Sequence, residues 1–192
     1  MSTPVLHLVA GSNGAGKTTF VTRVLAPRTH LPFVNADDIA ARLWPGDRDE
    51  QARRAPDVSR LATEERGRLL ADRASFIAET VFSHPSKLEL VDTAEAAGYV
   101  VWLHAILIPA DLAVERVADR VVAGGHLVPE AKVRQRYARL WTLVAEARGH
   151  VDRATFYDNS RIDAPFRRVA VYEHGIPIGV PAWPAWTPPA LR

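Results

Sequence analysis

The chain has 192 residues, of which 47% are hydrophobic and 24% are charged, and its formal net charge is +2 at pH 7. This length and composition predict one sizeable core in a single domain, residues 1–192, while the absence of cysteine excludes disulfides and thiolate chemistry. The longest apolar run, residues 99–110, is too short to span a bilayer, so we expect a cytoplasmic protein with no membrane partner. The mild, dispersed positive charge also makes nucleic acid an unfavoured partner.

The first elements predict a phosphate-binding loop. Residues 4–10 form an apolar run of strand length, residues 11–18 read Gly-Ser-Asn-Gly-Ala-Gly-Lys-Thr, and residues 18–25 can begin a helix. Glycines let the backbone wrap a phosphate, a lysine can reach the β- and γ-phosphates of ATP, and a threonine hydroxyl can hold magnesium. Lys17 is the lysine expected to contact the phosphates, and Thr18 is the threonine expected to hold magnesium. We expect ATP to be bound by Gly11, Ser12, Asn13, Gly14, Ala15, Gly16, Lys17, Thr18 and Thr19.

The middle of the chain alternates strands and helices. Residues 31–35 predict a second strand, Asp37 and Asp38 open a short helix, and residues 49–73 are helical with a break near Pro56. Residues 74–80 predict a third strand, 86–97 a helix, and 99–108 a central strand that is apolar apart from His104.

The last third of the chain begins with a predicted helical hairpin, residues 110–122 and 130–148, joined by a Gly-Gly turn. Residues 154–158 predict a fifth strand and 168–172 are a candidate sixth. From residue 175 the prolines predict an extended arm, whose Trp183 and Trp186 pack on the domain or on a partner. The alternation predicts an α/β fold with a parallel sheet of five strands and a candidate sixth. The hairpin, about residues 110–139, would be its lid.

Polar side chains follow the first three strands, at the edge where parallel sheets bind ligands. Opposite the phosphate loop, the carboxylate of Asp37 could act as the base that takes the proton of an attacking hydroxyl. The alternative is that Asp37 or Asp38 caps the following helix. Glu79, beside Thr80, could bind magnesium through water or hold a substrate hydroxyl. Its alternative role is to pair with a core arginine.

The hairpin bears arginines on both arms, Arg116 and Arg120 on the first and Arg134, Arg136 and Arg139 on the second. A closing lid could bring such side chains onto the transferred phosphoryl group, although a solvated arginine face is the alternative. Asn159 lies just after the fifth strand, where residues either bind a base or form a turn.

Missing motifs narrow the class of protein. The chain has no Asn-Lys-x-Asp run for guanine and no Leu-Ser-Gly-Gly-Gln run of transporter ATPases. The strand over residues 100–108 ends without an acid, so the usual Walker-B aspartate is missing there. This pattern favours a small-metabolite kinase over a GTPase switch or a mechanical ATPase.

Several stretches in this order resemble the zeta-toxin family, and in particular its small chromosomal branch. They are Gly-Ser-Asn-Gly-Ala-Gly-Lys-Thr-Thr-Phe (11–20), Val-Asn-Ala-Asp-Asp-Ile-Ala (34–40), Glu-Thr-Val-Phe-Ser (79–83), Gly-Gly-His-x-Val-Pro (124–129), Arg-x-Arg-Tyr (134–137) and Tyr-Asp-Asn-Ser (157–160). The resemblance spans about residues 4–160. It implies a P-loop fold like that of nucleoside-monophosphate kinases, with a five-stranded parallel core and three layers. It also implies an enzyme that uses ATP and magnesium to phosphorylate the 3′-hydroxyl of the sugar in UDP-N-acetylglucosamine.

The resemblance further assigns roles by position. Asp37 would be the general base, while Glu79 and Thr80 would hold the nucleotide sugar. Lys17 and Thr18 would hold ATP and magnesium. The arginines that stabilise the transferring phosphoryl group would be Arg120 together with Arg134 or Arg136.

We therefore expect an ATP- and magnesium-dependent kinase acting on a nucleotide sugar. Two other functions are open from the sequence: a kinase of polynucleotide ends, or a non-catalytic ATP-binding partner in a toxin–antitoxin pair. A small antitoxin protein is a candidate partner, whether the chain is a zeta-toxin-like kinase or a non-catalytic member of such a pair.

Overall fold

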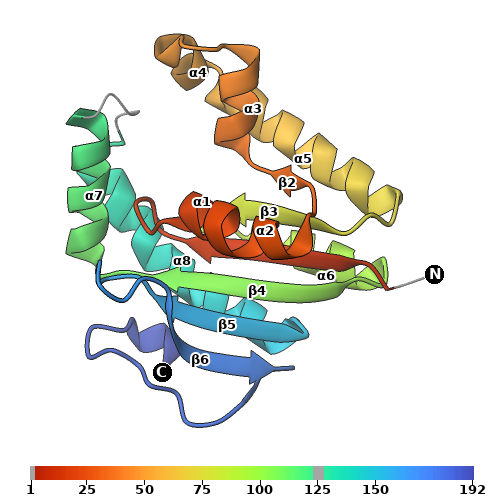
Figure 1. The fold of residues 1–192 in the computed structure, drawn as a ribbon, viewed down its shortest axis with the longest axis vertical. Helices are drawn as coiled ribbons and strands as arrows, with labels where there is room; N and C mark the ends of the chain where they lie inside the picture. Colours follow the sequence, from red (N-terminus) through yellow and green to blue (C-terminus); the bar gives the residue numbers. More distant parts are fainter. Residues whose placement is uncertain (1–2, 123–127) are drawn as a thin grey trace.

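The computed structural model describes residues 3–122 and 128–192, in which one sheet lies between helices on both of its faces (Figure 1). The sheet has seven strands in the order β2-β3-β1-β4-β5-β6-β7. The strands are β1 (Val5–Gly11), β2 (Phe33–Val34), β3 (Phe76–Thr80), β4 (Val100–Leu107), β5 (Arg153–Asp158), β6 (Arg167–Glu173) and β7 (Ile176–Pro177).

The first five strands pair in parallel, as predicted, whereas β6 and β7 run antiparallel. The candidate sixth strand is thus confirmed, but the expectation that it extends the parallel sheet is wrong. The cause is the short connection over residues 159–166, because a parallel neighbour needs a longer crossover, usually a helix.

The helices divide between the two faces of the sheet and a projecting arm. The helices are α1 (Lys17–Phe20), the π-helical η1 (Val21–Leu25), α2 (Ala26–Thr29), α3 (Ala36–Leu43), α4 (Arg48–Arg53), α5 (Ala55–Ala71), α6 (Ser86–Ala96), α7 (Ala110–Val122), α8 (Glu130–His150) and the 3₁₀-helical η2 (Pro189–Leu191). The predicted break near Pro56 is confirmed, since α4 ends at Arg53 and α5 carries the proline in its first turn. In Figure 1, α3, α4 and α5 rise beyond the β2 edge of the sheet, while α7 rises beside the carboxyl ends of the parallel strands. None of the described helices combines the length and the apolar character needed to cross a bilayer.

Alternate residues of the central strands supply two separate cores. Leu8 of β1 and Leu103 of β4 face the core that α5, α6 and α8 cover, whereas Val9 and Ile106 face the core under α1, η1 and α7. This alternation is the period-2 geometry of a strand, and full burial on both faces explains why β4 reads as a continuous apolar run.

Two histidines form a buried pair between β1 and β4. The ring nitrogens His7 Nδ1 and His104 Nε2 lie 3.1 Å apart. Burial, reinforced by His7, lowers the pKa of His104 from 6.5 to about 3. Burial lowers the pKa of His7 as well, so both rings favour the neutral form in the folded protein at pH 7.

Acid is expected to destabilise the fold through His104. Its folded pKa is depressed, so its contribution to the free energy of unfolding is complete above pH 6.5 and is lost as the pH falls toward 3. Between pH 7 and pH 4.5 we expect a loss on the order of 2 kcal/mol from this group. Urea unfolding at the two pH values should show a smaller acid loss for His104→Leu than for the wild type. The exposed control His174→Asn should keep the wild-type loss, and equal losses in all three proteins would contradict the assignment.

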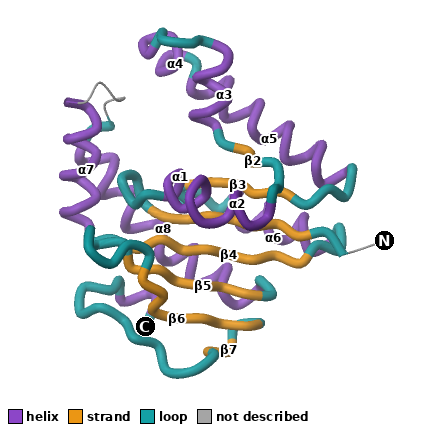
Figure 2. The backbone as a smooth tube through the Cα atoms, viewed as in Figure 1, coloured by secondary structure: helices purple, strands orange, loops and turns teal. Residues whose placement is uncertain are grey.

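The C-terminal arm runs back along β6 and then packs under the sheet (Figure 2). The amides of Ile178 and Ala182 donate to the carbonyls of Val171 and Val169, at 2.8 and 2.7 Å. Trp183 packs edge-on against Phe156, with ring centroids 5.2 Å apart. Of the two predicted destinations for the tryptophans, the domain itself is confirmed, because both tryptophans pack against its core.

Candidate functional site

The loop over residues 11–16 joins β1 to α1 in the geometry of a phosphate cradle. Gly14 and Gly16 have φ of 75° and 87°, in the left-handed region that glycine adopts without strain. Lys17 is the first residue of α1, and its Nζ donates to the carbonyl of Ser12 at 3.0 Å. The buried Ser12 hydroxyl has no hydrogen-bond partner among the described residues. A phosphate oxygen within the loop would provide the acceptor that this hydroxyl lacks, so the loop fits the group predicted for it.

Gly11 packs too closely against β4 to leave room for a side chain. A Cβ at this position would lie 2.7 Å from the backbone oxygen of Ile106 on β4, which cannot move away as a side chain could. Gly11→Ala should therefore lower the free energy of unfolding in urea by about 1–3 kcal/mol. The control is Gly67→Ala in α5, where a Cβ would meet no atom within 4 Å and should leave stability unchanged or raise it by up to about 1 kcal/mol. Equal stabilities of the two variants would contradict this packing argument.

Glu79, at the carboxyl end of β3, contacts the phosphate loop directly. Its Oε2 accepts from the Thr18 hydroxyl at 2.8 Å and from the Asn35 amide at 2.9 Å, and its Oε1 lies 3.8 Å from Lys17 Nζ. Among the described residues these three are its partners, and none of them is the core arginine of the alternative interpretation. Burial raises the pKa of Glu79, while Lys17 and the Thr18 hydroxyl oppose the rise.

The phosphate loop does face a strand-end acid, Glu79, although the Walker-B aspartate expected at the end of β4 is missing. The sequence places no acid at the end of β4, but β1 pairs with β3 on its other side. In this strand order, the acid that faces the loop comes from β3.

Asn35 joins the second strand to this cluster. Its side-chain oxygen accepts from the Asp37 amide at 2.7 Å and caps α3, so neither Asp37 nor Asp38 is the cap. Both aspartates are exposed in the first turn of α3, and the negative charge of each adds to the rise in the pKa of Glu79 that burial causes. Asn35 was not singled out from the sequence, although an asparagine just before a helix is a recognisable capping signal.

Thr80 follows Glu79 and faces the turn after β3. Its hydroxyl accepts from the backbone amide of Phe82 at 3.2 Å. Phe82 is buried with φ of 59°, so the chain turns sharply immediately after the two predicted substrate residues.

On the other side of α1, Asn159 ties the loop to β5 and α7. Its side-chain amide donates to the carbonyl of Ala15 at 2.8 Å. Arg116 of α7 donates to the carbonyls of Asn159 and Gly14, at 3.1 and 3.4 Å. The sequence placed Arg116 on the lid but did not select it, because the rotation of α7 against the loop cannot be read from spacing alone.

The other predicted lid arginines divide between α8 and the end of α7. Arg134 is exposed and pairs with Asp111 of α7 and Glu130 of α8, both at 2.8 Å, so it joins the two arms of the hairpin. Arg136 is half-buried on α8. The side chain of Arg120 and residues 123–127, which hold the Gly-Gly turn, lie outside the described residues.

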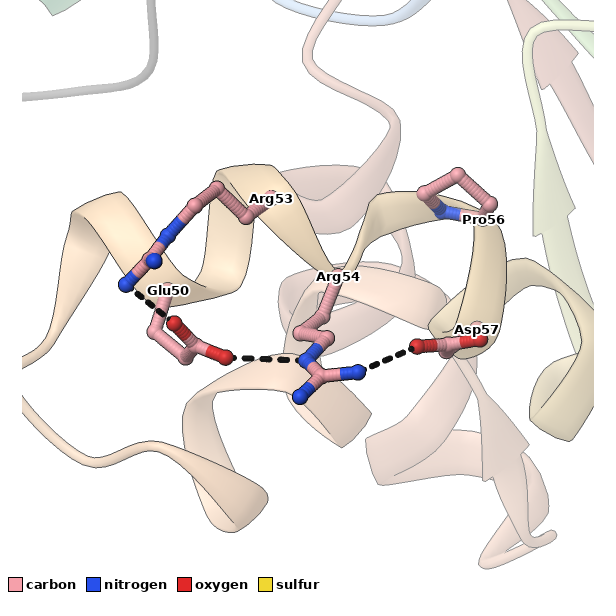
Figure 3. Close-up of a pocket in the computed structure, with 5 residues that line it drawn as sticks. All are labelled: Glu50, Arg53, Arg54, Pro56 and Asp57. Atoms are coloured by element: carbon pink, nitrogen blue, oxygen red, sulfur yellow. Dashed lines mark hydrogen bonds and ion pairs between the residues drawn. The ribbon is translucent and has the colours of Figure 1, made fainter.

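A cavity of about 670 Å³ adjoins the loop on the Asn159 side. It includes Gly16 and Thr19 of the predicted ATP site. Four arginines also line it, one each from η1, α2, α7 and the loop after β5. Its lining residues are Gly16, Thr19, Phe20, Arg23, Val24, Arg28, Arg116, Tyr157, Asn159, Arg161, Ile162, Pro165 and Phe166. A smaller hollow of about 290 Å³ lies at the junction of α4 and α5, where Arg54 bridges Glu50 and Asp57 (Figure 3). Its charges compensate one another, so the larger cavity is the better candidate.

Comparison with known proteins agrees with this geometry. A sequence profile of the zeta toxin family matches residues 1–168. A search of curated protein sequences finds no significant match.

Solved structures share the fold at low sequence identity. A chain from the AvrRxo1-ORF1:-ORF2 structure with ATP has a TM-score of 0.71 and 18% identity, covering 92% of this chain and 60% of that one. A chain of the PezAT chromosomal toxin–antitoxin system of Streptococcus pneumoniae has a TM-score of 0.63 and 16% identity, covering 82% and 68%. Shikimate kinase from Acinetobacter baumannii, in complex with shikimate, has a TM-score of 0.52 and 22% identity, covering 76% and 80%. The present chain therefore spans three fifths of the AvrRxo1 chain.

Proposed function

The chain belongs to the zeta toxin family, and from this premise we propose that it is an ATP- and magnesium-dependent kinase. Its proposed acceptor is a sugar hydroxyl of a nucleotide sugar such as UDP-N-acetylglucosamine. The observation that carries the proposal is the hydrogen bond between Thr18 of the phosphate loop and Glu79 of β3. Asn35, which also bonds Glu79, caps the helix whose first turn holds Asp37 and Asp38. A cradle for phosphate thus faces acidic groups from the next two strands, as phosphoryl transfer requires.

The loop residues would hold the triphosphate. The backbone amides over residues 11–16, the Ser12 hydroxyl and the start of α1 point positive charge at the phosphates, and Lys17 would turn from the Ser12 carbonyl to their oxygens. We propose that the nucleoside half lies in the 670 Å³ cavity beside Thr19 and Asn159.

Thr18 and Glu79 offer the hard oxygen ligands that magnesium prefers. The Thr18 hydroxyl would hold the ion directly and Glu79 would hold it through water, with the Asn35 amide fixing the carboxylate. The ion would neutralise charge on the phosphate oxygens during transfer.

Asp37 is the proposed base. As the acceptor oxygen bonds to the γ-phosphorus, the bond to the bridging oxygen of ADP breaks and the acceptor proton passes to the Asp37 carboxylate. Glu79 and Thr80 are proposed to orient the acceptor beside it.

We propose Arg116 as an arginine that contacts the phosphates, in addition to Arg120 and Arg136. The partners of Arg116 are backbone carbonyls, so no carboxylate neutralises its charge among the described contacts. Arg134, which two acids already compensate, is proposed instead to hold the hairpin together. A small antitoxin is the proposed protein partner, because the PezAT neighbour is part of a toxin–antitoxin system.

The test is transfer of label from γ-labelled ATP to a panel of nucleotide sugars, followed by mass spectrometry of the products. We expect one phosphoryl group on one nucleotide sugar, with magnesium required and EDTA abolishing transfer. Transfer to no member of the panel would contradict the acceptor, and failure of ATP to stabilise the protein thermally would contradict the kinase.

A further inference from the structure

One imidazole and two carboxylates meet between the ends of α6 and α8. Asp92 and Glu95 lie three residues apart on α6, and His150 is the last residue of α8. One ligand atom from each side chain lies within 4.8 Å of the ligand atoms of the other two. Residues three apart share a face of a helix, so α6 presents both acids to the histidine of α8. The fold thus brings together a mixed nitrogen and oxygen donor set from two helices that are distant in the sequence.

The helix ends that carry these side chains are anchored in the core. Val91 and Ala94, the residues just before the two acids, are fully buried on α6. Directly after His150, Val151 is fully buried where the chain passes from α8 to β5. The two helices also contact each other. The backbone therefore holds the three positions in place, and an ion would have to order only the side chains.

The three side chains are not committed to other protein groups. Within residues 3–122 and 128–192, none of them forms a side-chain hydrogen bond or an ion pair. Two arginines near these helix ends have other partners, because Arg148 donates to the carbonyl of Leu191 and Arg73 donates to that of Ala97. The lone pairs of the two carboxylates and the imidazole are therefore available to a metal ion.

The chemistry of the donor set selects among metal ions. Zinc binds histidine nitrogen and carboxylate oxygen at about 2.0–2.2 Å, so two of its ligand atoms lie about 3–4 Å apart. A small rotation of the side chains brings the observed spacing into that range. Magnesium and calcium prefer oxygen ligands, whereas an imidazole suits zinc.

We propose that Asp92, Glu95 and His150 bind one Zn²⁺ ion, with water completing its coordination. The ion links the ends of α6 and α8, which lead into the amino ends of the parallel strands β4 and β5. The phosphate loop instead follows the carboxyl end of β1, which is parallel to β4. The zinc site therefore lies at the opposite edge of the sheet from the proposed kinase site, and its role is to stabilise the packing of the two helices.

Isothermal titration of the untagged full chain with ZnCl₂ tests the site. The protein is first treated with EDTA and dialysed, and the buffer contains excess Mg²⁺, which competes at sites made of oxygen alone. We expect one Zn²⁺ per chain. Asp92→Asn, Glu95→Gln and His150→Gln should each weaken the zinc affinity by at least about tenfold. Absence of zinc binding in the wild type, or wild-type affinity in His150→Gln, overturns the site.

Two control variants match the chemistry that is removed. Glu146→Gln takes away an exposed carboxylate of α8, and His30→Asn takes away an exposed histidine at the end of α2. Asparagine also tolerates the left-handed backbone of position 30, where φ is 55°. Both variants should bind zinc as the wild type does. A loss in either control as large as that in His150→Gln would mean that zinc binds nonspecifically, and would overturn the proposal.

Thermal unfolding separates metal binding from a simple attraction between His150 and the two acids. Zinc should raise the melting temperature of the wild type, because an ion that binds only the folded state stabilises it. With EDTA present, His150→Gln should melt within about 2 °C of the wild type, and zinc should give it no gain. A loss that is as large in EDTA as in zinc would assign His150 to an ion pair and overturn the proposal.

The choice of ion is tested in the same assay. Calcium at the zinc concentration should not raise the melting temperature, and an equal gain with calcium would overturn the assignment to zinc. These measurements use no nucleotide, so failure of the kinase proposal would leave their outcome unchanged.

Discussion

Replacing Asp37 by asparagine is expected to lower kcat for phosphoryl transfer by about 10²- to 10⁴-fold, while ATP affinity changes little. Asparagine keeps the size of the side chain and the cap of α3, which Asn35 provides, but it cannot take a proton. Steady-state kinetics with ATP and a nucleotide sugar would measure both constants.

Asp38→Asn is the matched control for this prediction. Both aspartates are exposed in the same turn of α3, and partial burial together with the charge of Asp37 raises the pKa of Asp38. We expect less than about a tenfold loss from Asp38→Asn, because the proposed base remains. If the two variants lose activity equally, the effect belongs to the acidic cluster as a whole and Asp37 is not the base.

Lys17→Met should reduce kcat/KM by at least about 10²- to 10³-fold. Methionine fills nearly the same volume but brings no charge to the β- and γ-phosphate oxygens. The change also removes the cation 3.8 Å from Glu79, whose pKa burial already raises, so weaker magnesium binding should accompany the loss. Isothermal titration with Mg·ATP and the transfer assay would measure the two effects.

Lys132→Met provides the control for lost lysine charge. Lys132 is exposed on α8, and its removal should leave ATP binding and transfer within about twofold of the wild type. Wild-type activity in Lys17→Met would mean that the loop does not hold the transferred phosphate.

The sequence was most informative where a local pattern determines a local structure. The phosphate loop, the five parallel strands and the break before α5 depend on nearby residues, and their predictions are confirmed. The direction of β6 was less accessible, since it depends on how the connection after Asp158 turns back.

The arrangement of the site depended on contacts between distant elements. Glu79 could be marked as a strand-end acid, but only the strand order places it against Thr18. In the sequence, Arg116 is one of several arginines of the predicted lid. In the structure, the orientation of α7 directs it to the backbone carbonyls of Asn159 and Gly14.

The C-terminal arm has a consequence for self-association. Its amides at Ile178 and Ala182 donate to carbonyls of β6, and the neighbouring Pro177 and Pro181 have no amide hydrogen. A strand from another molecule would find few donors along this border, which blunts the usual route to edge-to-edge aggregation. The exposed Ile176 and Val180 can thus face water in concentrated solution without the sheet growing from one molecule into the next.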